Sequence, residues 1–196
     1  HKPEDISFTL TKNYLYKSDL VALDIILSNI HERPIYFSQT VDDDYLGLPA
    51  YFQLEGMAYR MVFHQLPSDS IGPGFVGSEQ MYQNMIEKFS WGNLSSKVYI
   101  EETSRRMCIN YRNNFSRLAL TLLEEGKIDS ACKVADYCLK VIPPRQIPHS
   151  YFSLPLVQAY LWAGKQEKAR EIMKQMAQEG SDRIKYYLSQ SDRILG

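Results

Sequence analysis

Residues 104–142 read SRRMCINYRNNFSRLALTLLEEGKIDSACKVADYCLKVI, and this stretch decides the fold. Up to Gly126, apolar side chains recur at three- and four-residue steps, which is the period of an amphipathic helix. The apolar stripe consists of Met107, Tyr111, Phe115, Leu118, Ala119 and Leu122. Gly126 ends this helix, and GKIDSA opens a second one that Pro143 and Pro144 stop. The stretch therefore predicts two helices joined by a tight turn.

The pair resembles a tetratricopeptide repeat, a helical hairpin of 34 residues. The signature positions are matched by the aromatic Phe115, by Leu118, by the small Ala119, by Leu122 in place of the usual Tyr, by Ala131, by the small Cys138 and by the closing Pro143. Short side chains at these positions let two helices approach closely.

A second copy follows at 153–176, SLPLVQAYLWAGKQEKAREIMKQM. The pattern GKxxxA, first seen at Gly126–Ala131, recurs at Gly164–Ala169, and the linker PPRQIPHS makes the spacing longer than the usual period. Residues 181–195 predict a separate last helix with Ser181 as its N-cap, which either caps the stack or begins a third repeat.

The N-terminal half mixes helix and strand signals. We expect strands at 6–10, 35–38, 57–64 and 97–101, and helices beginning at Ser18 and covering 47–56 and 79–89. The helix from Ser18 is expected to bury Leu20, Leu23, Leu27 and Ile30. The predicted fold is mostly α: a small α+β unit at 1–103 and a tetratricopeptide-like unit of stacked helical hairpins at 104–196, packed together as one globular body.

Composition narrows the classes of function. Apolar residues make up 44% and charged residues 23% of the chain, as in a soluble globular protein. The net charge of −1 gives no basic field for nucleic acid. No run approaches the roughly 20 apolar residues that cross a bilayer. The start at His1 suggests a piece of a longer protein. The three cysteines lack metal or redox spacing and are expected in the core.

No motif points to a catalytic centre. GPGFVG at 72–77 matches the dinucleotide pattern GxGxxG, but LPSDSI separates it from the preceding strand, which favours an ordinary loop. Asp42–Asp44 contains an Asp-x-Asp spacing that holds a cation in some enzymes and is more often a solvated turn. The four histidines, at 1, 31, 64 and 149, have no metal-ligand spacing. We assign no catalytic residue, cofactor or metal.

Three segments carry a family resemblance. They are KSDLVALDIILSNIHERPIYFSQTV at 17–41, GLPAYFQLEGMAYRMV at 47–62 and MYQNMIEKFSWGNL at 81–94. They resemble the soluble C-terminal region of bacterial multi-spanning membrane proteins that are similar to protein O-mannosyltransferases. The resemblance implies a parent with many membrane helices, a tail on the periplasmic side of the cytoplasmic membrane, and a glycosyltransferase that uses a lipid-linked sugar, or a protein shaped like one. It also implies that the catalytic acidic residue lies in a region absent from this chain.

The leading hypothesis is a non-catalytic accessory domain whose helical-repeat surface binds a protein or peptide partner. The candidate surface consists of Arg105, Tyr111, Arg112, Tyr151 and Tyr160, of which Tyr111 and Tyr160 also fit a core position. One alternative is contact with a saccharide or lipid-linked donor through aromatics and Asp42–Asp44. Another is a structural brace for the membrane helices. A binder predicts an exposed aromatic groove, a sugar site predicts aromatics flanked by carboxylates, and a brace predicts an apolar patch near the N-terminus.

Overall fold

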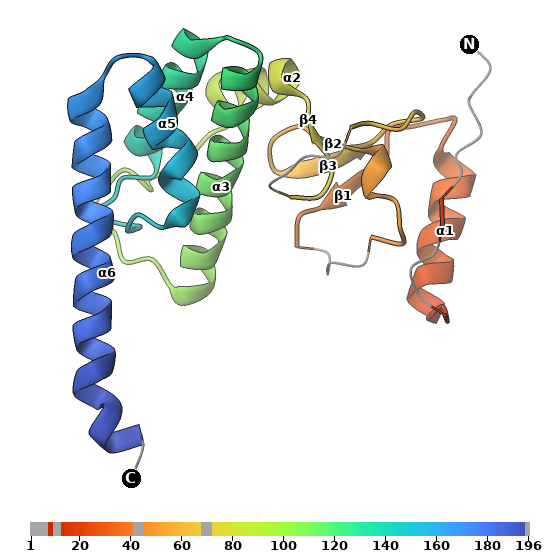
Figure 1. Ribbon diagram of the computed structural model, residues 1–196. Coiled ribbons are helices and arrows are strands. Elements are labelled where there is room, and N and C mark those ends of the chain that lie inside the picture. Colours follow the sequence, from red (N-terminus) through yellow and green to blue (C-terminus); the bar gives the residue numbers. More distant parts are fainter. Residues whose placement is uncertain (1–7, 10–12, 41–44, 68–71, 195–196) are drawn as a thin grey trace. The chain divides into compact units, whose positions relative to one another are not determined.

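The computed structural model describes residues 8–9, 13–40, 45–67 and 72–194, with side chains up to residue 190 (Figure 1). Most of the predicted strand 6–10 and all of Asp42–Asp44 lie outside the described residues. The chain forms two compact units, His1–Met85 and Ile86–Gly196. This division falls before the predicted boundary at 103/104, and the prediction that both units form one body stays a prediction.

The N-terminal unit contains a helix, α1 (Lys17–Asn29), and a four-stranded sheet in the order β1-β3-β2-β4. The strands are β1 (Tyr36–Ser38), β2 (Phe52–Leu54), β3 (Ala58–Met61) and β4 (Phe75–Val76). β3 pairs antiparallel with β1 and β2, and β2 pairs parallel with β4. The rings of Phe37, Tyr45, Phe52 and Tyr59 pack together in its core. The expected strands near 35–38 and 57–64 are confirmed.

The predicted helix at 47–56 is wrong. A single 3-10 turn, η1 (Pro49–Tyr51), leads directly into strand β2. The residues of β2 alternate between buried and half-buried, with Phe52 and Leu54 fully buried. Pairing on both sides of β2 therefore overrides the local helical pattern, as tertiary contacts often do.

The buried face of α1 also differs from the prediction. Ile26 is the buried residue of this helix, whereas Leu20 is 54% and Leu27 is 73% exposed. Apolar side chains surround α1, so the sequence pattern did not single out one face. Val21 and Ile25 are exposed on the helix as well.

The glycines of GPGFVG serve packing in this structure. Within 72–77, Phe75 and Val76 form β4, and the other four residues lie outside helices and strands, so the predicted loop is correct only for these four. Gly74 has φ +72°, and a Cβ there would lie 2.7 Å from the carbonyl oxygen of Phe52. The expected helix at 79–89 appears as α2 (Ser78–Tyr82) followed by a π-helical segment, η2 (Gln83–Lys88). The predicted strand at 97–101 is wrong: this segment has no strand partner, and Tyr99 is 91% exposed.

The C-terminal unit consists of two helical hairpins (Figure 1). The first pairs α3 (Glu102–Glu124) with α4 (Ile128–Val141), and the second pairs α5 (Leu154–Trp162) with α6 (Gln166–Ile194). A short 3-10 turn, η3 (Tyr151–Ser153), precedes α5. The mostly-α fold and the C-terminal hairpins are confirmed. Assignment of the hairpins to the tetratricopeptide class stays an interpretation.

The two hairpins turn in the same way. Gly126 has φ +74° and donates to the Leu123 carbonyl, while Lys127 donates to the Leu122 carbonyl. The same pair of bonds recurs where α5 ends, with Gly164 at φ +72°. These are Schellman turns, in which glycine adopts the left-handed conformation at little cost. The repeated GK of the sequence is thus a repeated turn.

Small side chains fill the space between the four helices. Ala119, Ala131, Ala135, Cys138, Ala159 and Ala169 are fully buried. All three cysteines are free and buried, as predicted.

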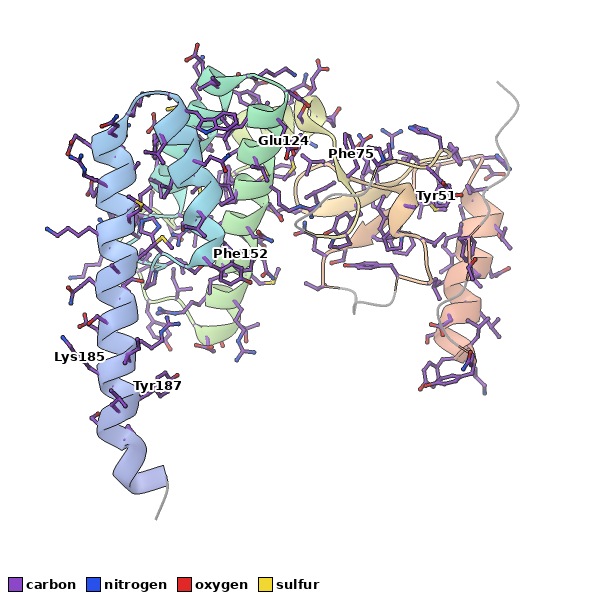
Figure 2. All side chains as sticks on the ribbon, viewed as in Figure 1. Tyr51, Phe75, Glu124, Phe152, Lys185 and Tyr187 are labelled. Atoms are coloured by element: carbon purple, nitrogen blue, oxygen red, sulfur yellow. The ribbon has the colours of Figure 1, made fainter. Side chains whose placement is uncertain are left out.

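The predicted separate helix with Ser181 as N-cap is wrong, because α6 runs without a break through Gly180 and Ser181. A single glycine inside a helix costs only about 1 kcal/mol, which one long helix absorbs. Side chains near the end of α6, such as Lys185 and Tyr187, project from the helix into open space (Figure 2). Tyr187 is 62% exposed.

Residues before α3 belong to the helical unit. The Trp91 ring lies 4.9 Å from the Phe115 ring and 5.9 Å from the Tyr111 ring, measured between centroids. Gln146 donates through its side-chain amide to the carbonyls of Ser96 and Val98, at 2.8 Å each. These contacts explain why the unit begins well before the first helix of the hairpins.

Candidate functional site

A hollow in the helical unit runs along one face of α6. One part, of about 770 Å³, is lined by Pro143, Pro144, Arg145, Glu171, Lys174, Gln175, Gln178 and Glu179. A second part, of about 370 Å³, is lined by Asp136, Leu139, Lys140, Pro144, His149, Tyr160, Lys168, Glu171, Ile172 and Gln175. The two parts share Pro144, Glu171 and Gln175, so we treat them as one feature, the α6 groove.

The helical period of α6 builds one wall of the groove. Glu171, Lys174, Gln175, Gln178 and Glu179 are three or four residues apart and therefore lie on one face. They present two amides that donate and accept hydrogen bonds, and charges of both signs.

The opposite wall is the segment 143–149, which buried Arg112 holds in place. The Arg112 side chain is 1% exposed and lies on α3. Its guanidinium donates to the carbonyls of Pro148 at 2.6 Å, Ile142 at 2.9 Å and Ile147 at 2.7 Å. Burial lowers the pKa of Arg112, yet an arginine starts so high that it keeps its charge. Arg112 is thus a positioning residue for this wall.

His149 lies at the end of the same wall as a neutral side chain. The imidazole is 5% exposed, and its Nδ1 is 3.0 Å from Ser153 Oγ. Burial, together with the nearby Arg112 charge, lowers the pKa of His149 to about 4. At neutral pH this group therefore carries no charge into the groove.

One end of the groove is closed by an ion-pair network between the hairpins. Asp136 Oδ1 accepts from Tyr160 Oη at 2.7 Å and from Lys168 Nζ at 2.6 Å. Burial alone would raise the pKa of Asp136, but the bonds from Lys168 and Tyr160 outweigh it and the pKa is lowered. Burial and Asp136 raise the pKa of Tyr160. The carboxylate stays ionised and the phenol stays protonated, so the network joins α4 to α5 and α6.

Glu179 brings an unpaired acceptor to the groove. Its Oε2 atom is buried and has no hydrogen-bond partner among the described atoms. Burial raises the pKa of Glu179, against the opposing effects of a backbone bond from His149 and the charges of Arg112 and Arg183. A buried carboxylate oxygen without a donor is costly, which agrees with the raised pKa of this group.

The five residues predicted as a binding surface do not form one surface. Tyr160 lines the groove and is 1% exposed, which agrees with the core position that the sequence also allows for it. Arg112 is 1% exposed and lies behind the wall, so its expected exposure is wrong. Tyr111 is half-buried against Trp91, and Arg105 is half-buried in the first turns of α3. Tyr151 is 68% exposed and lies tilted against Phe152, with ring centroids 4.0 Å apart.

Sequence reasoning missed the α6 wall. The available signal was a run of polar side chains at helical spacing, from Glu171 to Glu179, after a segment that begins with two prolines. Polar side chains at this spacing are also typical of any solvated helix face, so the run does not by itself indicate a groove. No group of three or more His, Cys, Asp or Glu side chains comes together within the described ranges. No helix among them is both long and apolar enough to cross a bilayer.

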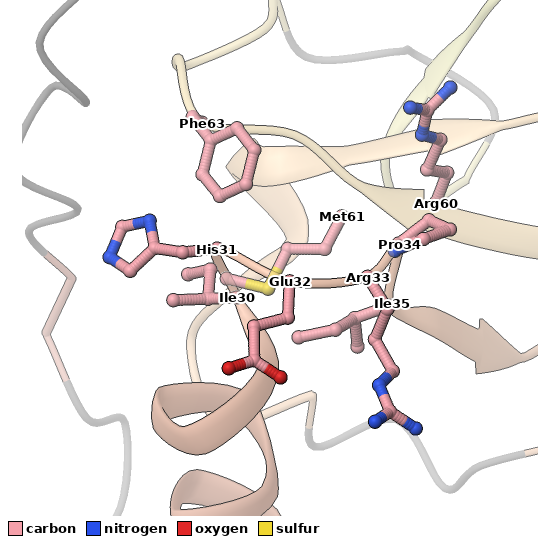
Figure 3. A pocket seen from close by; sticks show the side chains of 9 residues that line it. All are labelled: Ile30, His31, Glu32, Arg33, Pro34, Ile35, Arg60, Met61 and Phe63. Atoms are coloured by element: carbon pink, nitrogen blue, oxygen red, sulfur yellow. The ribbon is translucent and has the colours of Figure 1, made fainter.

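In the N-terminal unit, a smaller pocket of about 250 Å³ lies where α1 ends (Figure 3). It is lined by Ile30, His31, Glu32, Arg33, Pro34, Ile35, Arg60, Met61 and Phe63. Arg33 and Arg60 leave the neighbourhood of Pro34 in opposite directions, and His31 lies at the other end of the pocket. The His31 ring stacks on that of Phe63 with centroids 6.5 Å apart.

Near this pocket, the buried carboxylate of Glu55 forms hydrogen bonds with side chains of β1 and β2. Glu55 is 7% exposed and accepts from Tyr36 Oη at 3.1 Å and from Gln53 Nε2 at 3.1 Å. Arg60 Nη1 lies 3.5 Å from the same carboxylate. The segments RPIYF and YFQLEGMAYR of the sequence thus meet in one polar network.

Residues 2–80 match the family model described as TMEM260-associated domain 2. The match covers most of the N-terminal unit and none of the helices α3 to α6. This part of the chain is thus similar to a domain that is associated with TMEM260-like membrane proteins. The match supports the expected link to a family of membrane proteins. No curated protein and no solved structure matches the chain.

Proposed function

We propose that the chain is a non-catalytic accessory domain of a membrane protein, placed outside the cytoplasmic membrane, and that its α6 groove binds an extended segment of a protein partner. The family match of residues 2–80 supports the accessory role. The α6 groove supports the binding role, because its size and its polar helix wall suit a peptide main chain. The parent of such a domain is a lipid-linked glycosyltransferase or a protein shaped like one.

The observation that carries this proposal is the α6 groove itself, whose helix wall presents two amide side chains and charges of both signs. An extended peptide offers a main-chain N–H at regular intervals, and the amide oxygens of Gln175 and Gln178 can accept from it. The Gln178 amide already donates to Asp182 and the Gln175 amide to Glu171, so it is the second N–H of Gln175 that can donate to a peptide carbonyl. Charges of both signs on the wall determine the position of the bound segment along the groove. They supply only a minor part of its binding affinity.

A sugar site fits the groove less well. Tyr160 is flanked by Asp136 and Glu171, which is the arrangement expected for a saccharide site. Its ring is buried, however, and its hydroxyl already donates to Asp136. It therefore offers no face on which a sugar ring can stack.

The test is selection from a displayed library of random peptides, with the protein as bait. Gln175→Trp places a bulky side chain where the two parts of the groove meet. Met173→Trp, at a site 44% exposed on α6 and outside the groove, is the matched control. We expect enriched peptides that bind the parent and the control but not Gln175→Trp. Failure to enrich any peptide, or equal loss in both variants, would refute the groove as a binding site.

A second candidate, the brace, is favoured by the exposed apolar side chains of α1. Leu20, Val21, Ile25 and Leu27 are all more than half exposed. Exposed apolar side chains near the N-terminus are what a brace predicts. If α1 braces membrane helices, Ile25→Asp in the whole membrane protein lowers its yield in the membrane, whereas Gln175→Trp does not.

A further inference from the structure

An apolar pocket adjoins the one drawn in Figure 3. Its volume is about 260 Å³, and it is lined by Phe8, Leu23, Ile26, Leu27, Ile30, Leu48 and Met61. Every lining side chain is apolar. Ile30 and Met61 also line the neighbouring pocket of about 250 Å³, so the two spaces meet at these residues.

The neighbouring pocket has a cationic rim. Arg33 and Arg60 are part of its lining, with Glu32 as the opposing charge. Arg60 is partly occupied by Glu55 at 3.5 Å, whereas the Arg33 side chain has no recorded partner among the described residues. Arg33 is therefore the cation available to a ligand.

We propose that these adjoining pockets bind a single-chain anionic amphiphile, an alkyl chain that ends in a phosphate. The chain fills the apolar pocket beneath α1, and the head group lies in the cationic pocket beside Arg33. An apolar pocket beside a cationic one suits such a ligand. The alkyl chain is buried among apolar side chains, and the phosphate lies beside a positive charge. The proposal concerns the N-terminal unit and does not depend on the α6 groove.

The volume limits the length of the chain. About 260 Å³ corresponds to roughly nine water molecules in bulk liquid. Burial of each methylene group contributes about a fourfold gain in affinity until the space is full. Affinity should therefore rise from hexyl to octyl to decyl phosphate and then level off.

The experiment is isothermal titration of the whole chain with these alkyl phosphates below their micelle-forming concentrations. Inorganic phosphate and an uncharged decyl glycoside serve as probes for the head alone and the chain alone. We expect binding of decyl phosphate, weaker binding of the glycoside and no measurable binding of inorganic phosphate. Arg33→Gln should weaken decyl phosphate about threefold and leave the glycoside unchanged, as for a partly exposed ion pair.

Two variants of α1 separate pocket binding from adsorption to its exposed surface. Leu27→Asp adds a carboxylate at the apolar pocket, and Val21→Asp adds one to a part of α1 that lines neither pocket. Both positions are exposed and lie three residues from Asp24, so the variants perturb folding alike. We expect at least a tenfold loss of decyl phosphate binding in Leu27→Asp alone. Equal losses, affinity that keeps rising beyond decyl, or no binding by the parent would overturn the proposal.

Discussion

At the scale of single residues, Arg112 is the side chain on which the helical unit most depends. It satisfies three carbonyls of the segment 142–148 from a fully buried position. Removing the guanidinium leaves these acceptors without a donor, and each unsatisfied buried group costs about 1–3 kcal/mol. A single substitution therefore affects α3 and the groove wall together.

We predict that Arg112→Met lowers the free energy of unfolding by about 3 kcal/mol, measured by urea denaturation. Arg105→Met, on the same helix and half-buried, should change it by less than about 0.5 kcal/mol. Similar stabilities for the two variants would contradict the role assigned to Arg112.

His149 gives the protein a dependence of stability on pH. Its pKa is lowered to about 4 by burial and by Arg112, so the unfolded chain binds more protons between pH 4 and 6.5. Stability should fall as the pH is lowered through this window, by about 3 kcal/mol in total, and this residue causes no further loss below it. The raised pKa of Glu179 acts in the opposite direction.

The measurement therefore compares the pH dependence of stability of the parent protein with that of a His149 variant. Urea denaturation of the parent and of His149→Gln at pH 7 and at pH 4.5 isolates the histidine contribution. The parent should lose more stability than the variant. An ordinary titration of His149 near pH 6.5, followed by NMR, would contradict the burial seen here.

At the scale of elements, the continuity of α6 leads to a prediction at Gly180. A Cβ at this position meets nothing within 4 Å, and the residue lies inside the helix. Gly180→Ala should stabilise the protein by about 0.8 kcal/mol in thermal or urea unfolding. Gly126→Ala, at φ +74°, should destabilise it by about 1 kcal/mol. No gain at Gly180 would mean that a helix ends there, as the sequence had suggested.

The buried face of α1 can be tested in the same way. Ile26 is 6% exposed and Leu20 is 54% exposed. Ile26→Ala should cost about 2–3 kcal/mol, and Leu20→Ala less than about 1 kcal/mol. A larger loss of stability in Leu20→Ala than in Ile26→Ala would mean that the buried face predicted from the sequence is the correct one.

At the scale of the whole molecule, the extent of the helical unit is open to measurement. The fragment 86–196 retains Trp91 against Phe115, and the fragment 104–196 loses it. We expect both to be helical by circular dichroism, with the shorter fragment less stable by about 3 kcal/mol. Trp91→Ala in the longer fragment should reproduce most of that loss. Equal stability of the two fragments would favour the boundary at 103/104.

The sequence predicts the C-terminal half well because its contacts are local. The apolar stripe around Phe115 and the repeated GK turns define each hairpin without reference to the rest of the chain. Strands of two to four residues lack such a signal, and β2 is a strand only because β3 and β4 flank it. The burial of Arg112 was not predictable, since it depends on carbonyls 30 or more residues away.

The three hydrogen bonds from Arg112 to the segment 142–148 also limit how far this segment can move. Because the anchoring atoms lie inside the bundle, this wall cannot swing away without breaking three bonds in a water-poor interior. The amides of the segment should exchange with deuterium only in openings that also loosen α3. A ligand then meets a wall whose conformational entropy was lost during folding, so binding need not order it again.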